Sequence, residues 1–291
     1  MPIEVAPLDA ALGARITGID LSRPLSDTEF ASVHAAWLDH QVLIFPDQNM
    51  DDEDQVRFSQ LFGELPDKAV HSKGTKSGQQ RHKSVMLVTN IREDGEVIGS
   101  LPDGEMHFHT DGAYERDPYR YTMLYAIEVP REGGDTMFAN MYRAYETLPE
   151  ELKERLDGVE AEQGFYTGVD VSDEMKQALR IDGYDGKAVH PVFIRHEETG
   201  RTAIYVNRLL TRRIIGCSDD ESRELLSRLF DHSEQSDMVY QHKWRPGDFV
   251  AWDNRCTNHA RTDFSGGQRR LLRRTTVQGV KPEPALSAVG A

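Results

Sequence analysis

Two histidines and one aspartate are the residues of this chain with the clearest potential for chemistry. His109 and Asp111 are separated by a single residue, and His259 follows far downstream, directly after the run 252–258. Two imidazoles and one carboxylate form a ligand set that holds ferrous iron on one face and leaves the opposite face open. A co-substrate and oxygen could bind at that open face. The three residues therefore predict an iron-dependent oxygenase.

The spacing of the first two residues agrees with a shared metal. In a β-strand, residues i and i+2 project from the same face, so His109 and Asp111 could both point into one barrel mouth. The alternative for this pair is a histidine at a strand edge that is hydrogen-bonded to a carboxylate. The alternative for His259 is a core histidine behind the strand that contains Trp252.

Two similar pairs occur elsewhere and show that the spacing alone is not specific. His196 is followed by Glu198, and His232 by Glu234. The first pair falls in a Glu-Glu-Thr-Gly turn and the second at the end of a predicted helix. We expect both histidines to lie at the surface.

Composition limits which partners and which cellular compartment are expected for this protein. The 291 residues carry a formal net charge of −15, with 49 acidic against 34 basic side chains. Such a chain lacks the basic face that nucleic-acid binding needs. Two cysteines make no disulfide framework, and neither a secretory signal nor an apolar run of membrane-spanning length is evident. We expect a protein of the cytoplasm with no membrane partner.

Helix and strand signals follow one another along the chain. Capping boxes at Ser26 and Ser218 predict helix starts, the first ahead of Phe30, Val33 and Trp37 at helical spacing. Further helices are expected at 51–62, 150–156 and 174–180. Short apolar or alternating runs bounded by turn residues predict strands at 42–45, 121–129, 136–139, 202–206, 239–244, 249–252 and 271–277.

This pattern predicts the fold class and the domain limits. Helices crowd the first quarter, and short strands separated by turns fill much of the rest, which is typical of a β-sandwich or barrel decorated with helices. No linker divides the chain, so we expect one domain over residues 1–280. Residues 281–291 are rich in Pro and Ala and are expected to form a loose tail.

Several motifs in order resemble one known family. These are 109–114 (His-Thr-Asp-Gly-Ala-Tyr), 133–136 (Gly-Gly-Asp-Thr), 252–259 and 270–277 (Arg-Leu-Leu-Arg-Arg-Thr-Thr-Val). Together with the opening segment 12–21 they resemble the TauD/TfdA group, which are Fe(II)- and 2-oxoglutarate-dependent dioxygenases. The resemblance runs from about residue 3 to residue 280.

The resemblance implies a fold, cofactors and roles for residues. The fold would be mainly β with flanking helices around a double-stranded β-helix, a jelly-roll or cupin-like core. His109, Asp111 and His259 would bind Fe(II), with O2 as the oxidant and no catalytic residue beyond the metal centre. Thr136 and Arg270 would hold the distal carboxylate of 2-oxoglutarate, since a guanidinium forks onto a carboxylate and a hydroxyl adds one hydrogen bond. The alternative for Arg270 is a solvated surface arginine.

A second set of residues would contact the substrate. On a strand, Arg270 and Arg274 share a face while Arg273 points away, so two inward arginines could serve two anions. The candidate substrate-contacting residues are Arg274, His71, Asn90 and Tyr114. A surface-loop histidine is the alternative for His71, and a purely structural role is the alternative for Asn90 and Tyr114.

Some residues depart from the family pattern. Phe108, after His107, stands where the family often has Trp, which changes the packing of the pocket. A carboxylate at position 111 disfavours a halide site. The segment 93–105 is expected to form a mobile flap, and because it differs from the taurine-specific enzyme it puts taurine in doubt as the substrate.

The expected reaction is the hydroxylation of a C–H bond in a small, anionic organic substrate. It would be coupled to the decarboxylation of 2-oxoglutarate to succinate and CO2. Desaturation or another oxidative step of secondary metabolism on the same iron centre is an alternative, and a non-enzymatic cupin-like binding protein is a more remote one. The family commonly forms homodimers or homotetramers, and we expect the same here.

Overall fold

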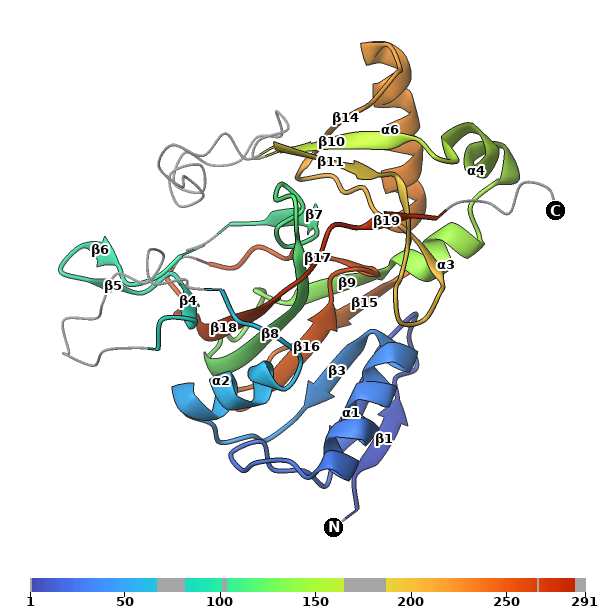
Figure 1. Ribbon diagram of the computed structural model, residues 1–291. Helices are drawn as coiled ribbons and strands as arrows, with labels where there is room; N and C mark the ends of the chain where they lie inside the picture. Colours follow the sequence, from blue (N-terminus) through green and yellow to red (C-terminus); the bar gives the residue numbers. More distant parts are fainter. Residues whose placement is uncertain (1, 67–81, 101–103, 165–186, 266, 286–291) are drawn as a thin grey trace.

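The computed structural model describes residues 2–66, 82–100, 104–164, 187–265 and 267–285. These residues form a mainly β molecule with helices at its two ends (Figure 1). The expected helix at 174–180 lies outside the described residues. No helix in the described part combines the length and apolar character needed to cross a bilayer.

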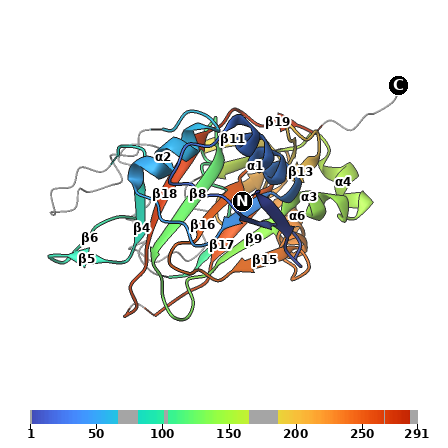
Figure 2. The same cartoon turned by 90° about the horizontal axis from the view of Figure 1, so that it is seen from below.

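A seven-stranded sheet forms the larger part of the core. Its strands in spatial order are β1 (Glu4–Pro7), β2 (Ala14–Thr17), β3 (Val42–Phe45), β16 (Phe249–Asp253), β8 (Tyr119–Glu128), β18 (Leu271–Gln278) and β4 (Met86–Thr89). Neighbours pair antiparallel except β2 and β3, which are parallel. In the view from below, β8, β16 and β18 run side by side through the middle of the molecule (Figure 2).

A four-stranded antiparallel sheet faces it. Its order is β15 (Val239–His242), β9 (Thr136–Asn140), β17 (Thr257–Arg261) and β7 (Met106–His109). Smaller sheets consist of β11 (Lys187–Pro191), β10 (Glu160–Gly164) and β14 (Thr211–Ile214), of β13 (Thr202–Ile204), β12 (Phe193–Arg195) and β19 (Glu283–Pro284), and of β5 (Arg92–Glu93) with β6 (Glu96–Val97). The expected flap thus begins with the β5–β6 hairpin, and residues 101–103 of it lie outside the described part.

Strand alternation divides the core into two layers. On β16, Val250 and Trp252 pack between the two sheets, with Phe138 of β9 opposite them. Phe249 and Ala251 point the other way and pack beneath the helices α1 (Asp27–His40) and α2 (Asp52–Gln60). Because successive side chains of a strand point to opposite faces, a central strand with both faces covered is apolar on both, as in residues Phe249 to Trp252 of β16. This explains the run of buried residues in β16.

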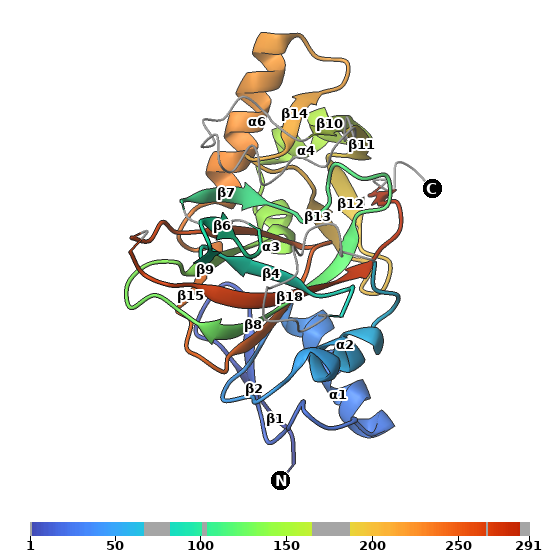
Figure 3. The ribbon, with the colours of Figure 1, turned by 90° about the vertical axis from the view of Figure 1, so that its left-hand side faces the viewer.

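The remaining helices cover the opposite end of the molecule. They are α3 (Met141–Glu146), α4 (Glu150–Leu156) and α6 (Asp219–Ser233), which pack with β12 and β13 around a separate apolar cluster. Figure 3 shows α6 at one end and α1 with α2 at the other, with the sheets between them. The two sheets are therefore covered by helices at both ends.

Helix starts follow the capping signals. Ser26 caps α1 in a full capping box with Glu29, and Asp51 does the same for α2 with Asp54. At α6, the Ser218 hydroxyl accepts from the backbone N–H of Glu221, but the box predicted there is incomplete. The Glu221 carboxylate pairs instead with Arg155, a residue distant in sequence.

The predicted loose tail needs a correction. Residues Glu283 and Pro284 form β19, which pairs with β12, and Ala285 is buried in the helix-covered cluster. The folded part of the domain therefore continues past residue 280 and includes Ala285, and β19 forms the edge strand next to β12. Residues 286–291 lie outside the described part.

Candidate metal centre

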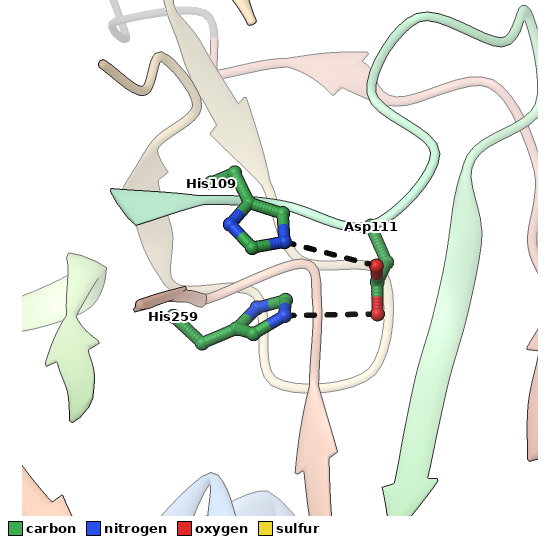
Figure 4. A group of neighbouring side chains, drawn as sticks. All are labelled: His109, Asp111 and His259. Carbon is green, nitrogen blue, oxygen red and sulfur yellow. Dashed lines mark ion pairs between the residues drawn. The ribbon is translucent and has the colours of Figure 1, made fainter. Parts of the chain in front are cut away.

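The three predicted metal ligands converge. His109 of β7 and His259 of β17 are cross-strand partners, and their ring centroids lie 4.1 Å apart. Their Nε2 atoms lie 4.0 Å and 3.8 Å from the two carboxylate oxygens of Asp111 (Figure 4). Asp111 lies in a turn just beyond the end of β7 and not on the strand as predicted, yet its side chain meets both rings.

The surroundings of both imidazoles favour the neutral form. His107 accepts a hydrogen bond through its backbone oxygen from Nδ1 of His109, 2.9 Å away, which leaves the Nε2 lone pair of that ring for a cation. Burial lowers the pKa of His109 and lowers that of His259 further, where the adjacent His109 ring adds to the effect. Neutral imidazole is the metal-binding form.

The surroundings of Asp111, the third candidate ligand, favour its ionised form. Burial by itself would raise the pKa of Asp111, but the charge of Arg274 and the two imidazoles lower it, and the pKa lies well below its usual range. Arg274 Nη1 lies 3.2 Å from Oδ1, and the Thr122 hydroxyl donates to Oδ2 at 2.7 Å. Two neutral imidazoles and one carboxylate, all buried, fit a divalent metal of the first transition row.

A cavity opens beside the two rings and ends in cationic side chains. Its apolar wall includes Val88, Leu124 and Trp252, and its polar wall includes Thr136, Arg261, Arg270 and Arg274. The arginines come from β17, from β18 and from the residue that precedes β18. The cavity therefore connects the candidate metal ligands with a site for an anion.

Arg270 is the most isolated cation in this cavity. Its side chain is 2% exposed, and its Nε and Nη1 atoms have no hydrogen-bond partner among the described residues. Burial lowers the pKa of the guanidinium and the charge of Arg261 lowers it further, while Asp135 opposes them. Since a guanidinium keeps its proton in proteins, the site is prepared for an incoming carboxylate.

Thr136 has its hydroxyl oriented for the same anion. The indole Nε1 of Trp244 donates to Thr136 Oγ1 at 3.0 Å. Because the oxygen already accepts this hydrogen bond, the hydroxyl proton is directed elsewhere, and Thr136 lines the cavity that contains Arg270. A hydroxyl donor and a forked guanidinium together suit a carboxylate.

The strand prediction for the arginine run is confirmed. Arg274 lines the cavity, whereas Arg273 lies on the opposite face of β18, where its guanidinium pairs with Asp52 at 2.7 Å and contacts the ring of Tyr125. The apolar Leu272, which lies between Arg270 and Arg274 in sequence, packs between the sheets.

The other candidate substrate residues differ in position. Tyr114 is packed near Met106 and Leu209, and burial raises the pKa of its hydroxyl. The amide of Asn90 is engaged at both ends, because its Oδ1 accepts from the backbone N–H of Arg270 and its Nδ2 donates to the backbone of Gln268. Asn90 thus supports the chain at Arg270. His71 lies outside the described residues.

The expectation that His196 lies at the surface is wrong. The side chain is 1% exposed, and its Nε2 lies 3.0 Å from Asp253 Oδ2. Cys256 lies close by, so these three residues form a second group of potential metal ligands. Arg255 already binds both oxygens of Asp253, which makes this group a buried ion pair. His232 is half-buried and bonds to the backbone oxygen of Ala144.

Three further residues shape the site without an individual sequence signal. They are Thr122, Trp244 and Asn254, of which only Asn254 falls within a motif of the sequence. The Trp244–Thr136 and Asn254–Thr122 contacts join segments 108 and 132 positions apart, so no local pattern points to them.

Comparisons with known proteins agree with this geometry. The model of the Taurine catabolism dioxygenase TauD, TfdA family matches residues 4–276. The chain is 34% identical over 280 residues to pentalenolactone F synthase of Streptomyces avermitilis, and the alignment covers 91% of this chain and 90% of that protein. It is 34% identical over 286 residues to (S)-phenoxypropionate/alpha-ketoglutarate-dioxygenase of Sphingobium herbicidovorans, which covers 95% of each.

A solved structure shares the fold. The crystal structure of a taurine dioxygenase from Burkholderia xenovorans matches with a TM-score of 0.80 and 29% identity, over 97% of this chain and 93% of that chain. The match extends across both sheets and the helices at either end. The chain therefore belongs to the TauD/TfdA family of Fe(II)- and 2-oxoglutarate-dependent dioxygenases.

Proposed function

We propose that this dioxygenase hydroxylates a C–H bond of a small organic anion and that His109, Asp111 and His259 hold its Fe(II). The observation that carries the proposal is the cavity lined by both histidines and by the buried Arg270, whose Nε and Nη1 have no hydrogen-bond partner among the described residues. A metal site alone would suit many proteins. A metal site and an anion site in one cavity suit an enzyme whose co-substrate is a keto acid.

The iron, when bound, supplies the oxidising chemistry, which couples decarboxylation of 2-oxoglutarate to succinate and CO2 with attack on the substrate. The protein orients the reactants. Arg270 and Thr136 would hold the distal carboxylate of 2-oxoglutarate, and Arg274 would bind the acidic group of the substrate. The apolar wall of the cavity, which includes Leu124 and Trp252, excludes water from the reacting atoms.

The two facing antiparallel sheets support a finer description of the fold. We propose that β15-β9-β17-β7 and β16-β8-β18-β4 form the two halves of a double-stranded β-helix. The two histidines lie on strands of the first half, and Arg274 lies on a strand of the second. The dimeric or tetrameric state stays a prediction, which light scattering tests. The cytoplasmic location also stays a prediction, which cell fractionation tests.

A screen for succinate release tests the function. The protein is incubated with Fe(II), 2-oxoglutarate, oxygen and a panel of sulfonates, sulfate esters, phenoxy acids and amino-acid derivatives. A true substrate raises succinate and oxygen consumption together, and the product mass separates hydroxylation (a gain of one oxygen) from desaturation (a loss of two hydrogens).

The His109→Ala variant tests the ligand assignment. We expect it to abolish turnover of 2-oxoglutarate, because the metal loses one of three protein ligands. His232→Ala is the matched control, since this half-buried histidine lies on α6, bonded to α3, outside the cavity. Full turnover in His109→Ala would refute the assignment. A visible charge-transfer band with anaerobic Fe(II) and 2-oxoglutarate should appear in His232→Ala and not in His109→Ala.

A further inference from the structure

We propose that Thr122 and Asn254 are positioning residues of the metal centre, because they end a one-way chain of hydrogen bonds that holds the carboxylate of Asp111. The inference rests on the proposed function, since it takes Asp111 as a ligand. It concerns residues that contact neither metal nor substrate and act through Asp111 alone.

The chain of hydrogen bonds has a direction that its donors dictate. The indole Nε1 of Trp252 can only donate, and it lies 3.0 Å from Oδ1 of Asn254. The amide Nδ2 of Asn254 then donates to Oγ1 of Thr122 at 2.9 Å. With its oxygen accepting, the Thr122 hydroxyl turns its single proton to Oδ2 of Asp111 at 2.7 Å.

Burial makes this direction stable. The exposed fractions of Trp252, Asn254 and Thr122 are 1%, 1% and 0%. Solvent therefore cannot replace a lost partner, and breaking one link leaves a buried polar atom unsatisfied. The chain is thus a fixed arrangement of donors that ends at one oxygen of the carboxylate.

The three candidate ligands need this support unequally. His109 and His259 lie on paired strands, so the sheet itself positions them. Asp111 lies in a turn that continues through Gly112, which adopts a φ of +75°. A turn backbone orients a side chain less strictly than a strand does. Thr122, in contrast, lies within β8 and pairs across the sheet with residues of β16 and β18.

The carboxylate of Asp111 also has a competing interaction with Arg274. Arg274 Nη1 lies 3.2 Å from Oδ1 of Asp111, on the side of the cavity. Without the Thr122 hydroxyl, the strongest remaining contact of the carboxylate is this guanidinium, which favours an ion pair with Arg274 over a metal bond. Loss of Thr122 should therefore weaken metal binding although no ligand is removed.

Metal titration tests the proposal without reference to turnover. Mn(II) is titrated into the metal-free protein anaerobically, and free Mn(II) is followed by its electron paramagnetic resonance signal. Thr122→Val keeps the shape and removes the hydroxyl, and we expect the Mn(II) dissociation constant to rise about 10–100-fold, the usual effect of losing a partner of a metal ligand. Thr122→Ser restores the hydroxyl and should return the constant to within about threefold of the wild-type value, since the same donor is present.

The sheet offers a matched control. Thr276 of β18 is the cross-strand partner of Thr122, is buried, and has a hydroxyl without a hydrogen-bond partner among the described residues. Thr276→Val should leave the Mn(II) constant unchanged. Thermal unfolding of each metal-free variant confirms that it folds, and Thr122→Ala replaces the valine variant if valine is not accommodated.

The outcomes separate this inference from the proposed function. If the wild-type protein binds no Mn(II) or Fe(II), the proposed function fails. If the wild-type protein binds and folded Thr122→Val binds equally well, or Thr276→Val weakens binding as much, only the positioning role is overturned. Weakening in Thr122→Val that serine reverses supports it.

Discussion

Replacement of Arg270 by methionine separates two consequences of one buried charge. Arg270 is 2% exposed, and among the described residues its guanidinium has no carboxylate within ion-pair distance and its Nε and Nη1 have no hydrogen-bond partner. Arg270→Met keeps a long side chain and removes the charge. We expect the variant to be more stable than the wild type without co-substrate and unable to gain stability from 2-oxoglutarate.

The magnitudes follow from burial and hydrogen bonding. Replacing a buried ionic group by an apolar one of similar size stabilises a protein by about 1–4 kcal/mol. For a chain of 291 residues this raises the melting temperature by about 2–6 °C. A forked contact with a carboxylate contributes two charge-assisted hydrogen bonds, about 3–6 kcal/mol together, so the dissociation constant of 2-oxoglutarate should rise about 10²–10⁴-fold.

Two measurements and one control variant at a neighbouring residue test this prediction. Calorimetric melting gives the stability of the protein with Mn(II) alone, and isothermal titration gives the affinity for 2-oxoglutarate. Arg269→Met is the control, because Arg269 is exposed and pairs with Glu128 at the surface; neither quantity should change beyond about 1 °C or twofold. An unchanged affinity in Arg270→Met would show that the co-substrate carboxylate binds elsewhere. A lower melting temperature would show that the charge is paired in solution.

Two further substitutions test the surroundings of the site. Trp244→Phe removes the donor that orients the Thr136 hydroxyl, so steady-state kinetics should show a KM for 2-oxoglutarate raised about 3–10-fold, equivalent to one neutral hydrogen bond, with little change in kcat; an unchanged KM would contradict this orientation. Asp253→Asn breaks a buried ion pair with Arg255 and should cost about 3–5 kcal/mol in urea unfolding at pH 7. Burial would raise the pKa of Asp253, but Arg255 and then His196 hold it below its usual value. The contribution is therefore complete above the ordinary carboxyl pKa and is lost only as the pH falls below about 4, and a cost that shrinks between pH 8 and pH 5 would contradict the assignment.

Local signals in the sequence predicted four of the described helices and several core strands, but not the smaller strands such as β10, β11, β12 and β14. The capping residues Ser26 and Asp51 begin α1 and α2, and the apolar run 42–45 is the buried strand β3. Such signals work because a cap or a strand period involves residues only a few positions apart. The same signal placed the start of α6 correctly at Ser218, but the second half of its predicted box is absent because Glu221 pairs with Arg155.

The burial of His196 is a second feature that local sequence signals did not predict. Its turn of polar neighbours indicated the surface, but the turn folds over β16 and places the ring against Asp253. The partner is 57 residues away. Burial of a polar side chain depends on which distant group receives it, and a turn motif contains no information about that group.

By itself, the sequence determined the mainly β class, the net negative charge of −15, and the set of two imidazoles, one carboxylate and inward arginines that indicates an oxygenase. These depend on residue type and on spacing along single strands. The tertiary structure alone decided that Asp111 reaches the histidines from a turn, that two guanidinium nitrogens of Arg270 have no hydrogen-bond partner in the described part of the chain, and that Thr122 and Asn254 meet across 132 positions. The physical reason is that hydrogen bonds inside a core form between groups that packing brings together, and packing joins residues whose separation no local pattern records.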